Sequence, residues 1–317
     1  MSYIPSKKLL TTKLKKIGII DIGSNAIRFS AAHYKKQDFY EILHRTRVPL
    51  RLGDSVFRTG LIPNSKIQLS TYFFEQFQEI AELYKIQRIE AIATSAVRDS
   101  KNQNRFVHEI HKKTGIEIKP ITGFQEASLI HLAISTHIKR KTPYIIFDLG
   151  GGSLECIIVD EKHRIINSKS FNFGTVRMLE VLNLQGRRLA KTYMDYHLES
   201  LNHFIRDHLT SKKFDIYGTG GNLRRMGKLR RSVLKKRSIQ EISLEETSLI
   251  KKELSRYNNL DRAARYKLKI DRSEVIIPSL MIFEYILKKL KSPRVYLPDL
   301  ALTDGLIINA IDEHEII

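Results

Sequence analysis

Two stretches of the chain, whose aspartates lie 127 positions apart, share one pattern: an apolar run that ends in aspartate, an apolar residue and glycine. They are residues 16–25 (KIGIIDIGSN) and residues 144–153 (YIIFDLGGGS). Runs of β-branched and aromatic residues bounded by glycine-rich turns are typical of a buried strand that leads into a loop. A chain of 317 residues has room for about two domains. The repeat therefore predicts two similar halves, each built around the same strand and loop.

The segments that follow each pattern repeat its order as well. The expected strands cover 27–33, 40–43, 89–93, 116–121, 155–160, 164–171 and 214–217, and the expected helices cover 64–84 (with Asn64 as N-cap), 104–113, 124–137, 194–209 and 275–290. Strands followed by alternating helices and strands, twice over, predict an α/β fold of two similar domains with a cleft between them. We place the domains at 1–138 and 139–317, with the last residues able to pack back on the first domain.

The composition limits the classes of protein. The net charge of +20 indicates a polyanionic partner, namely nucleic acid, an anionic membrane or a phosphorylated ligand, although a solvated lysine surface explains the charge equally well. No window approaches ~18 consecutive apolar residues, so no spanning helix is expected. The N-terminus has basic residues but no apolar signal region. The single cysteine, Cys156, excludes an internal disulfide framework. We expect a cytoplasmic protein without a membrane partner.

Three glycine-rich loops follow predicted strands, at 21–25, 148–153 and 218–222. Without a Cβ, such loops let an anion approach their backbone N–H groups closely. One glycine cluster is more often an ordinary turn, but three of them, two with an aspartate at the strand end, predict that loops from both halves clamp a phosphate chain. The expected phosphate-binding residues are Asp21, Gly23, Ser24, Asn25, Gly150, Gly151, Gly152, Ser153, Gly218, Thr219, Gly220 and Gly221.

Charged side chains beside these loops have both functional and ordinary interpretations. Mg²⁺ prefers oxygen ligands, which favours Asp148 beside its three glycines as a metal ligand, although aspartates at such turns also cap the backbone. Arg98 follows the strand at 89–93 and is placed either to hold phosphate in a bidentate manner or to pair with a surface carboxylate. Glu126 opens a predicted helix, where a carboxylate ordinarily complements the helix dipole.

Taken in order, these motifs resemble the exopolyphosphatase/guanosine pentaphosphate phosphohydrolase (Ppx/GppA) family, within the actin–hexokinase–chaperone ATPase superfamily. The resemblance is carried by residues 21–25, 93–98, 123–127, 148–155, 173–177, 218–221 and 271–278. It runs from Gly18 to about Leu306. It implies two actin-like (RNase H-like) α/β domains in the short two-domain form, and it is compatible with a homodimer.

The resemblance also implies an activity, the hydrolysis of a terminal phosphoanhydride with release of orthophosphate. Glu126 would be the base that activates water, Asp148 a ligand of Mg²⁺ or another divalent cation, and Glu155 a residue beside the metal and the water. Arg98 would contact substrate phosphate. The substrate would be inorganic polyphosphate, guanosine pentaphosphate or both. Phosphoryl transfer agrees with these roles because it needs an in-line water, neutralised oxygens and a rigid cradle.

The chain departs from the family pattern at several positions, which bear on substrate preference more than on fold. Gln125 stands where a first glutamate is usual, Ala26 replaces a common serine, and Asn222 replaces a usual threonine. Near the C-terminus, Glu274 replaces an aspartate and Thr303 stands at the arginine of a common Arg-Glu-Gly stretch.

Eight basic residues crowd into 223–237, directly after the third loop. Such a run is usually an exposed helix face, but here it is also a candidate track for a polyanion leaving the cleft. The run lacks the aromatic residues that stack on single-stranded nucleic acid, which argues against a nucleic-acid partner. Because of the basic run and the short two-domain form, we expect polyphosphate ahead of guanosine pentaphosphate. Two other functions stay open: an ATP-dependent kinase of the same superfamily, and a catalytically impaired polyanion-binding protein.

Overall fold

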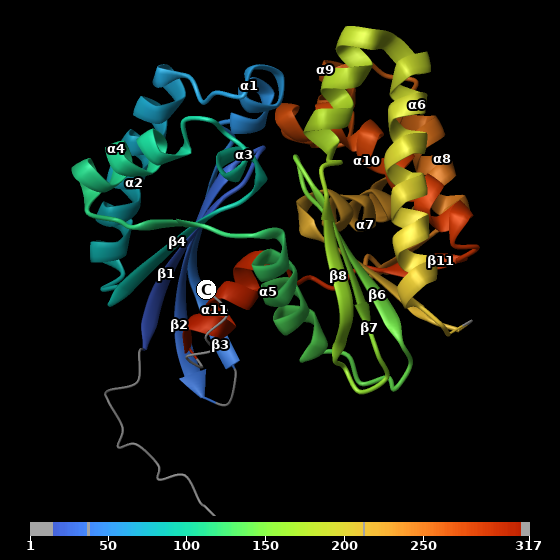
Figure 1. Cartoon of the computed structure of the whole chain (residues 1–317), viewed down its shortest axis with the longest axis horizontal. Coiled ribbons are helices and arrows are strands. Elements are labelled where there is room, and N and C mark those ends of the chain that lie inside the picture. The colour runs from blue at the N-terminus through green and yellow to red at the C-terminus, as the bar shows by residue number, and fades with distance from the viewer. Residues whose placement is uncertain (1–14, 37–38, 212, 312–317) are drawn as a thin grey trace, which may run out of the picture.

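The computed structural model describes residues 15–36, 39–211 and 213–311, which form two α/β halves, each around one sheet (Figure 1). The first sheet has the order β3-β2-β1-β4-β5 and the second has the order β10-β11-β9-β6-β7-β8. The strands are β1 Lys16–Ile22, β2 Ile27–Lys36, β3 Phe39–Val48, β4 Arg88–Ala93, β5 Ile118–Pro120, β6 Tyr144–Leu149, β7 Leu154–Val159, β8 Ile165–Phe171, β9 Asp215–Thr219, β10 Glu241–Ser243 and β11 Arg294–Tyr296.

The two sheets repeat one topology. In the first, β1, β2 and β3 form an antiparallel meander, and β4 and β5 continue the sheet parallel to β1. In the second, β6, β7 and β8 form the same meander, and β9 and β11 continue it in parallel, with β10 as an additional antiparallel edge strand. The predicted class, two similar actin-like (RNase H-like) α/β units, is confirmed by this shared order.

The described helices alternate with these strands. They are α1 Leu52–Thr59, α2 Asn64–Leu83, α3 Ser95–Arg98, α4 Gln103–Thr114, α5 Gly123–Ser135, α6 Thr175–His208, α7 Gly220–Leu234, α8 Leu244–Leu254, α9 Asn259–Arg265, α10 Ile270–Lys289 and α11 Leu302–Ile311. The structure corrects two helix starts. Pro63, not Asn64, is the N-cap of α2, because its extended backbone ends just before the helix. The helix expected at 194–209 begins at Thr175 and is interrupted at Gly186, whose φ of 74° is left-handed.

Each half has its own apolar core, and a third core joins them. Phe29, Phe74 and Phe106 lie in the first core, and Phe147 and Phe283 lie in the second. The third contains residues of β1 and β4 from one sheet and of β6 and β7 from the other, packed with α5 and α11. Side-chain burial of this kind on both halves binds them into one body.

The two central helices α5 and α11 are exchanged between the halves. Helix α5, which precedes the second sheet in the chain, packs on β7 and β8, and α11, which ends the described chain, packs on β1 and β2. The two helices also pack on each other, side by side between the sheets in Figure 1. The described end of the chain therefore returns to the first half. The exact limits at 138 and 139 stay a prediction.

Within the described residues, no helix is both long enough and apolar enough to span a membrane. The N-terminal stretch inspected above for a signal sequence lies mostly outside these residues, since positions 1–14 are not described.

The crossing of α5 and α11 offers a test of this arrangement. At Gly305 of α11, an added Cβ would overlap the carbonyl oxygen of Leu129 in α5. Alanine ordinarily favours a helix over glycine, but here we expect Gly305→Ala to lower the free energy of unfolding by roughly 1–3 kcal/mol, because the helices must move apart. Chemical denaturation measures the change. Thr303→Ala on the same helix is the control, and equal stability of both variants and the wild type would contradict the close crossing.

Candidate active site

The glycine-rich loops of the two halves face each other across a cavity of about 430 Å³. The loop after β1, the loop after β6 and the start of α7 all lie at the carboxyl ends of central strands, where α/β sheets bind ligands. Eleven of the predicted site residues line this cavity: Asp21, Gly23, Ser24, Asn25, Glu126, Asp148, Gly150, Gly151, Ser153, Gly220 and Gly221. The tertiary structure therefore brings together loops that are more than a hundred residues apart in the chain.

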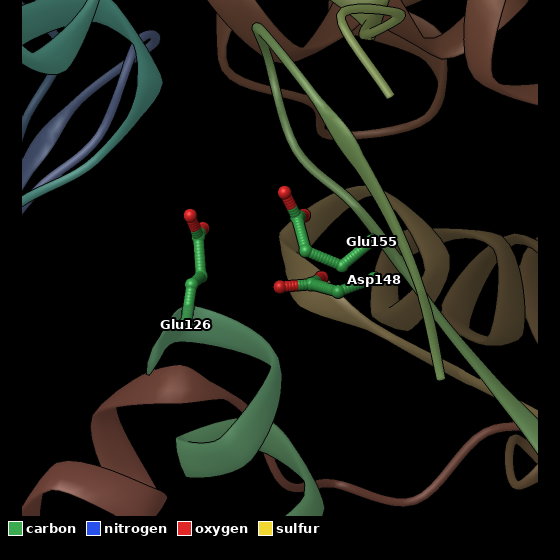
Figure 2. A group of neighbouring side chains, drawn as sticks. All are labelled: Glu126, Asp148 and Glu155. Atoms are coloured by element: carbon green, nitrogen blue, oxygen red, sulfur yellow. The ribbon is translucent and has the colours of Figure 1, made fainter. Parts of the chain in front are cut away.

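Three carboxylates, those of Glu126, Asp148 and Glu155, meet in the site. One oxygen from each lies within 4.8 Å of the others. Figure 2 shows Glu126 extending from the first turn of α5 toward the two side chains on the opposite strands. Asp148 is the next-to-last residue of β6 and Glu155 is the second residue of β7, and the two residues are direct partners in the antiparallel register. A single hairpin thus sets the distance between two of the acids, while the third comes from another element.

The electrostatics of this cluster are unfavourable unless a proton or a cation is bound. All three side chains are buried. Burial, and then the nearby charge of Glu155, raise the pKa of Asp148 to about 7. Burial, followed by the charge of Glu155, raises the pKa of Glu126 well above its usual range, although the positive charge of Arg98 opposes this. Burial also raises the pKa of Glu155.

Two of these oxygens have the properties of metal ligands. Glu155 accepts a hydrogen bond from the Ser170 hydroxyl through Oε1 at 2.9 Å, whereas its Oε2 and the Oδ1 of Asp148 are buried without a hydrogen-bond partner among the described residues. An unpaired buried carboxylate oxygen is costly, and a hard divalent cation such as Mg²⁺ would satisfy it. The donor set therefore fits a divalent metal.

Arg98 contacts the cluster through Glu126. It ends the short helix α3 that follows β4, and its Nη1 donates to Glu126 Oε2 at 3.2 Å and to the carbonyl oxygen of Ile121 at 3.0 Å. It does not line the cavity itself. The structure thus pairs Arg98 with the predicted base, a contact that sequence reasoning did not anticipate.

Three of the predicted phosphate-binding residues, Gly152, Gly218 and Thr219, are not among the residues that line the cavity. A Cβ at Gly152 would collide with Phe57 and two serines of the first half, and one at Gly218 would collide with Leu223 and other apolar side chains of the core. Thr219 donates its hydroxyl to the carbonyl oxygen of Leu300. The structure therefore places these residues in packing positions.

A set of cations also lines the cavity, and sequence reasoning had singled out only those of the basic run at 223–237. The cations are Arg28, Arg45, Arg47, Arg224, Arg225, Lys228, Lys269 and Arg272. Part of the signal was present, because Arg45 and Arg47 alternate along a strand and therefore share one of its faces. The basic run at 223–237 supplies three more from α7. Cations thus reach the cavity from both halves.

Two of these arginines are held by polar side chains of the glycine-rich loops. Arg28 Nη1 donates to Asp21 Oδ2 at 2.6 Å, so the first predicted aspartate positions a cation in the cavity. Arg272 Nη1 donates to Asn222 Oδ1 at 2.9 Å. Burial, and then the neighbouring charge of Arg28, lower the pKa of Arg272 to about 9. An anionic ligand would relieve this concentration of positive charge.

Departures from the expected motif have structural roles here. Gln125 forms a capping box with Thr122, in which its Oε1 accepts a hydrogen bond from the backbone N–H of Thr122 at 3.0 Å. The glutamine side chain therefore makes the same cap that a glutamate would make. Glu274 pairs with Arg51 of the other half. These positions therefore stabilise the elements around the site.

The fold and the cavity define a two-sheet α/β protein whose site suits a phosphorylated ligand, and comparison with known proteins identifies its family. A model described as the Ppx/GppA phosphatase family matches residues 31–314. The chain therefore belongs to the Ppx/GppA phosphatase family.

Several curated and solved proteins are similar to it. Exopolyphosphatase 1 of Mycobacterium tuberculosis is 25% identical over 310 residues, which cover 94% of this chain and 88% of that protein. A bifunctional 3-dehydroquinate synthase/phosphatase of Fusobacterium nucleatum is 27% identical over 219 residues, 64% of this chain but 32% of that protein. A crystal structure of an exopolyphosphatase from Cytophaga hutchinsonii matches with a TM-score of 0.85 at 21% identity, covering 95% of this chain and 99% of that chain, which supports the fold.

The buried acids lead to a prediction on stability. Between about pH 4, where Asp148 ionises in the unfolded chain, and about pH 7, where it ionises in the folded one, stability should fall as pH rises, because the folded state retains the proton longer. In metal-free buffer at about pH 8, Asp148→Asn should therefore stabilise the protein by up to a few kcal/mol in the free energy of unfolding. The thermal unfolding midpoint should rise accordingly.

Addition of Mg²⁺ supplies the second half of the test, since a ligand that binds only the folded state stabilises it. Calorimetry should show a rise in the unfolding midpoint for the wild type and a much smaller one for Asp148→Asn. Equal Mg²⁺ shifts in the two proteins would contradict a metal site at Asp148.

Proposed function

We propose that this protein is a divalent-metal-dependent hydrolase that releases orthophosphate from the end of inorganic polyphosphate. One observation carries the proposal: three buried carboxylates meet at a cavity that cations from both halves line, with Glu126 and Asp148 in its wall and Glu155 close to both. The carboxylates provide a base and metal ligands, and the cations suit a chain of phosphate groups rather than a single charge. The family membership and the name of the Mycobacterium tuberculosis relative agree with this assignment.

The residues of the site divide into those that act on water and those that hold phosphate. Asp148 and Glu155 would hold the metal, which when bound neutralises phosphate oxygens. Glu126 would take the proton of the attacking water, and its raised pKa makes it a stronger base than an ordinary glutamate. Arg98 keeps Glu126 oriented through its hydrogen bond to Oε2. The loop amides and Arg28 would stabilise charge on the transferred group.

The cavity favours polyphosphate over guanosine pentaphosphate. None of the described residues that line it carries an aromatic ring, so a guanine base would find no aromatic side chain on which to stack. Stacking on a side chain is worth about 1–3 kcal/mol per base where it occurs. A polyphosphate chain needs only cations and amide donors, which the cavity supplies.

One experiment separates the proposed activity from its alternatives. Phosphate release is measured from polyphosphate, guanosine pentaphosphate and ATP, each with and without Mg²⁺. We expect release from polyphosphate that requires the metal. ADP formation that depends on an acceptor, without action on polyphosphate, would instead indicate a kinase, and salt-sensitive binding without release would indicate a binding protein.

The role of Glu126 has a direct test. We expect Glu126→Gln to reduce kcat roughly 10²–10⁴-fold, because the amide cannot accept the proton of water. Its thermal unfolding should show an intact fold. Glu117→Gln, at an exposed position of the same half, is the matched control and should keep full activity. Near-normal turnover by Glu126→Gln would rule out this residue as the base.

The cation-lined wall predicts a dependence on charge. Arg225→Gln should raise KM for polyphosphate about tenfold, because a charge-assisted hydrogen bond contributes roughly 1.5–3 kcal/mol. Arg231→Gln, on the same helix but outside the cavity, should leave KM nearly unchanged. Added salt should also weaken the apparent affinity of the wild type. A flat salt response, with equal KM values for both variants, would assign the excess charge to solvated surface alone.

A further inference from the structure

A continuous series of polar contacts leads from the second glycine-rich loop to Glu126 and crosses from one half to the other. Arg177, in the first turn of α6, donates from Nε to the carbonyl oxygen of Gly152 at 2.7 Å and from Nη2 to Asp99 Oδ2 at 2.6 Å. The other oxygen of Asp99 lies 3.6 Å from Arg98 Nε. Arg98 then reaches Glu126, as described above. One carboxylate therefore bridges two arginines, one from each half.

The position of Arg177 is tightly defined. Its guanidinium lies 3.7 Å from the ring centre of Phe57, a residue of α1 in the other half, and its side chain is only 18% exposed. Burial lowers its pKa, although the charge of Asp99 opposes this. The same Phe57 ring closely covers Gly152, where a Cβ would collide with it. Arg177 thus fills the junction between the glycine-rich loop and the first half.

Asp99 is the residue that joins this junction to the site. It is the C-cap of α3 and follows Arg98 directly. Of the two residues, Arg98 contacts the predicted base and Asp99 contacts the opposite half. A change in the separation of the halves would therefore act on Asp99 and, through it, on the side chain of Arg98.

We propose that Asp99 and Arg177 are positioning residues that align Arg98 and Glu126 with the phosphate-binding loop 150–153 when the two halves are joined. The proposal rests on the proposed function, since it concerns the geometry of that reaction. Phosphate held by the loop would fix the Gly152 carbonyl and Arg177, and Asp99 would transmit this order to the base. Glu126 and the loop 150–153 would then be correctly aligned only when these contacts hold the two halves together.

The simpler interpretation is that Asp99 and Arg177 only tie the halves together. A second ion pair between the two halves, that of Arg51 with Glu274, serves as the matched control. It also spans the two halves, and within the described part of the chain its residues neither line the cavity nor make a hydrogen bond or ion pair with Arg98 or Glu126. Loss of this pair removes an interdomain contact without touching the series described above.

The test compares kcat and KM for polyphosphate with Mg²⁺ in the wild type, Asp99→Asn, Asp99→Glu, Arg177→Gln, the double variant Asp99→Asn/Arg177→Gln and Glu274→Gln. We expect Asp99→Asn to lower kcat roughly 10–100-fold with KM changed less than about threefold, as is typical when the partner of a catalytic group is removed. Asp99→Glu should recover most of kcat, and Glu274→Gln should keep it. The double variant Asp99→Asn/Arg177→Gln should lose no more than the worse single variant, because the two residues act as a unit.

Three results would overturn the proposal: near-normal kcat in Asp99→Asn, an equal loss in Glu274→Gln, or a change confined to KM. An inactive wild type, or a fully active Glu126→Gln, would contradict the proposed function instead. A crystal structure of Asp99→Asn decides the matter independently of activity. We expect Arg98 Nη1 to leave Glu126 Oε2 in that variant, and retention of the contact at its present 3.2 Å would contradict a positioning role.

Discussion

The burial of three carboxylates within 4.8 Å of one another is the constraint on which the rest of the site depends. Like charges in a desolvated place repel strongly, so the cluster persists only with protons, a metal or paired arginines. The hairpin of β6 and β7 places two of the acids directly opposite each other, and α5 adds the third. Arg98 is the one cation hydrogen-bonded to this cluster among the described residues, which explains why its own support by Asp99 matters to the geometry.

The same elements that bring the acids together also join the two halves. Helix α5 carries Glu126, yet it packs on the second sheet, while α11 returns from the second half to the first. Around the cavity, the halves meet through polar pairs: Arg47 with Asp271, Arg51 with Glu274, and Arg177 with Asp99. A shared apolar core thus fixes the base of the cleft, and ion pairs set the approach of its walls. Because a charged ligand alters the strength of nearby ion pairs, we expect ligand binding to change the spacing of the cleft walls more than the shared apolar core.

The structure shows where part of the large positive charge of the chain lies. Arginines and lysines from β2, β3, α7 and α10 face the cavity, and their common field would draw a polyanion toward the carboxylate cluster, where a metal could offset the repulsion. Other members of the basic run do not face it. Arg230, for example, pairs with Glu246 at 2.8 Å and serves the packing of α7 on α8. Only part of the charge therefore belongs to the site.

The local sequence determined most of the strands, the glycine-rich loops and the pair formed by Asp148 and Glu155, because strand periodicity, glycine turns and hairpin register depend on neighbouring residues. The short strands β10 and β11 were not expected from the sequence. Local pattern also accounts for its errors: the loop at 218–222 looks like the others, but tertiary packing turns Gly218 into the core. The approach of Glu126 to the hairpin, the inward placement of Arg28 and Arg272, and the bridge from Arg177 to Asp99 were decided only by the tertiary structure. The contacts of Arg98 with Glu126 and of Arg177 with Asp99 join residues 28 and 78 positions apart, and Arg28 and Arg272 come from different elements. Which faces meet at such separations depends on how whole sheets and helices pack.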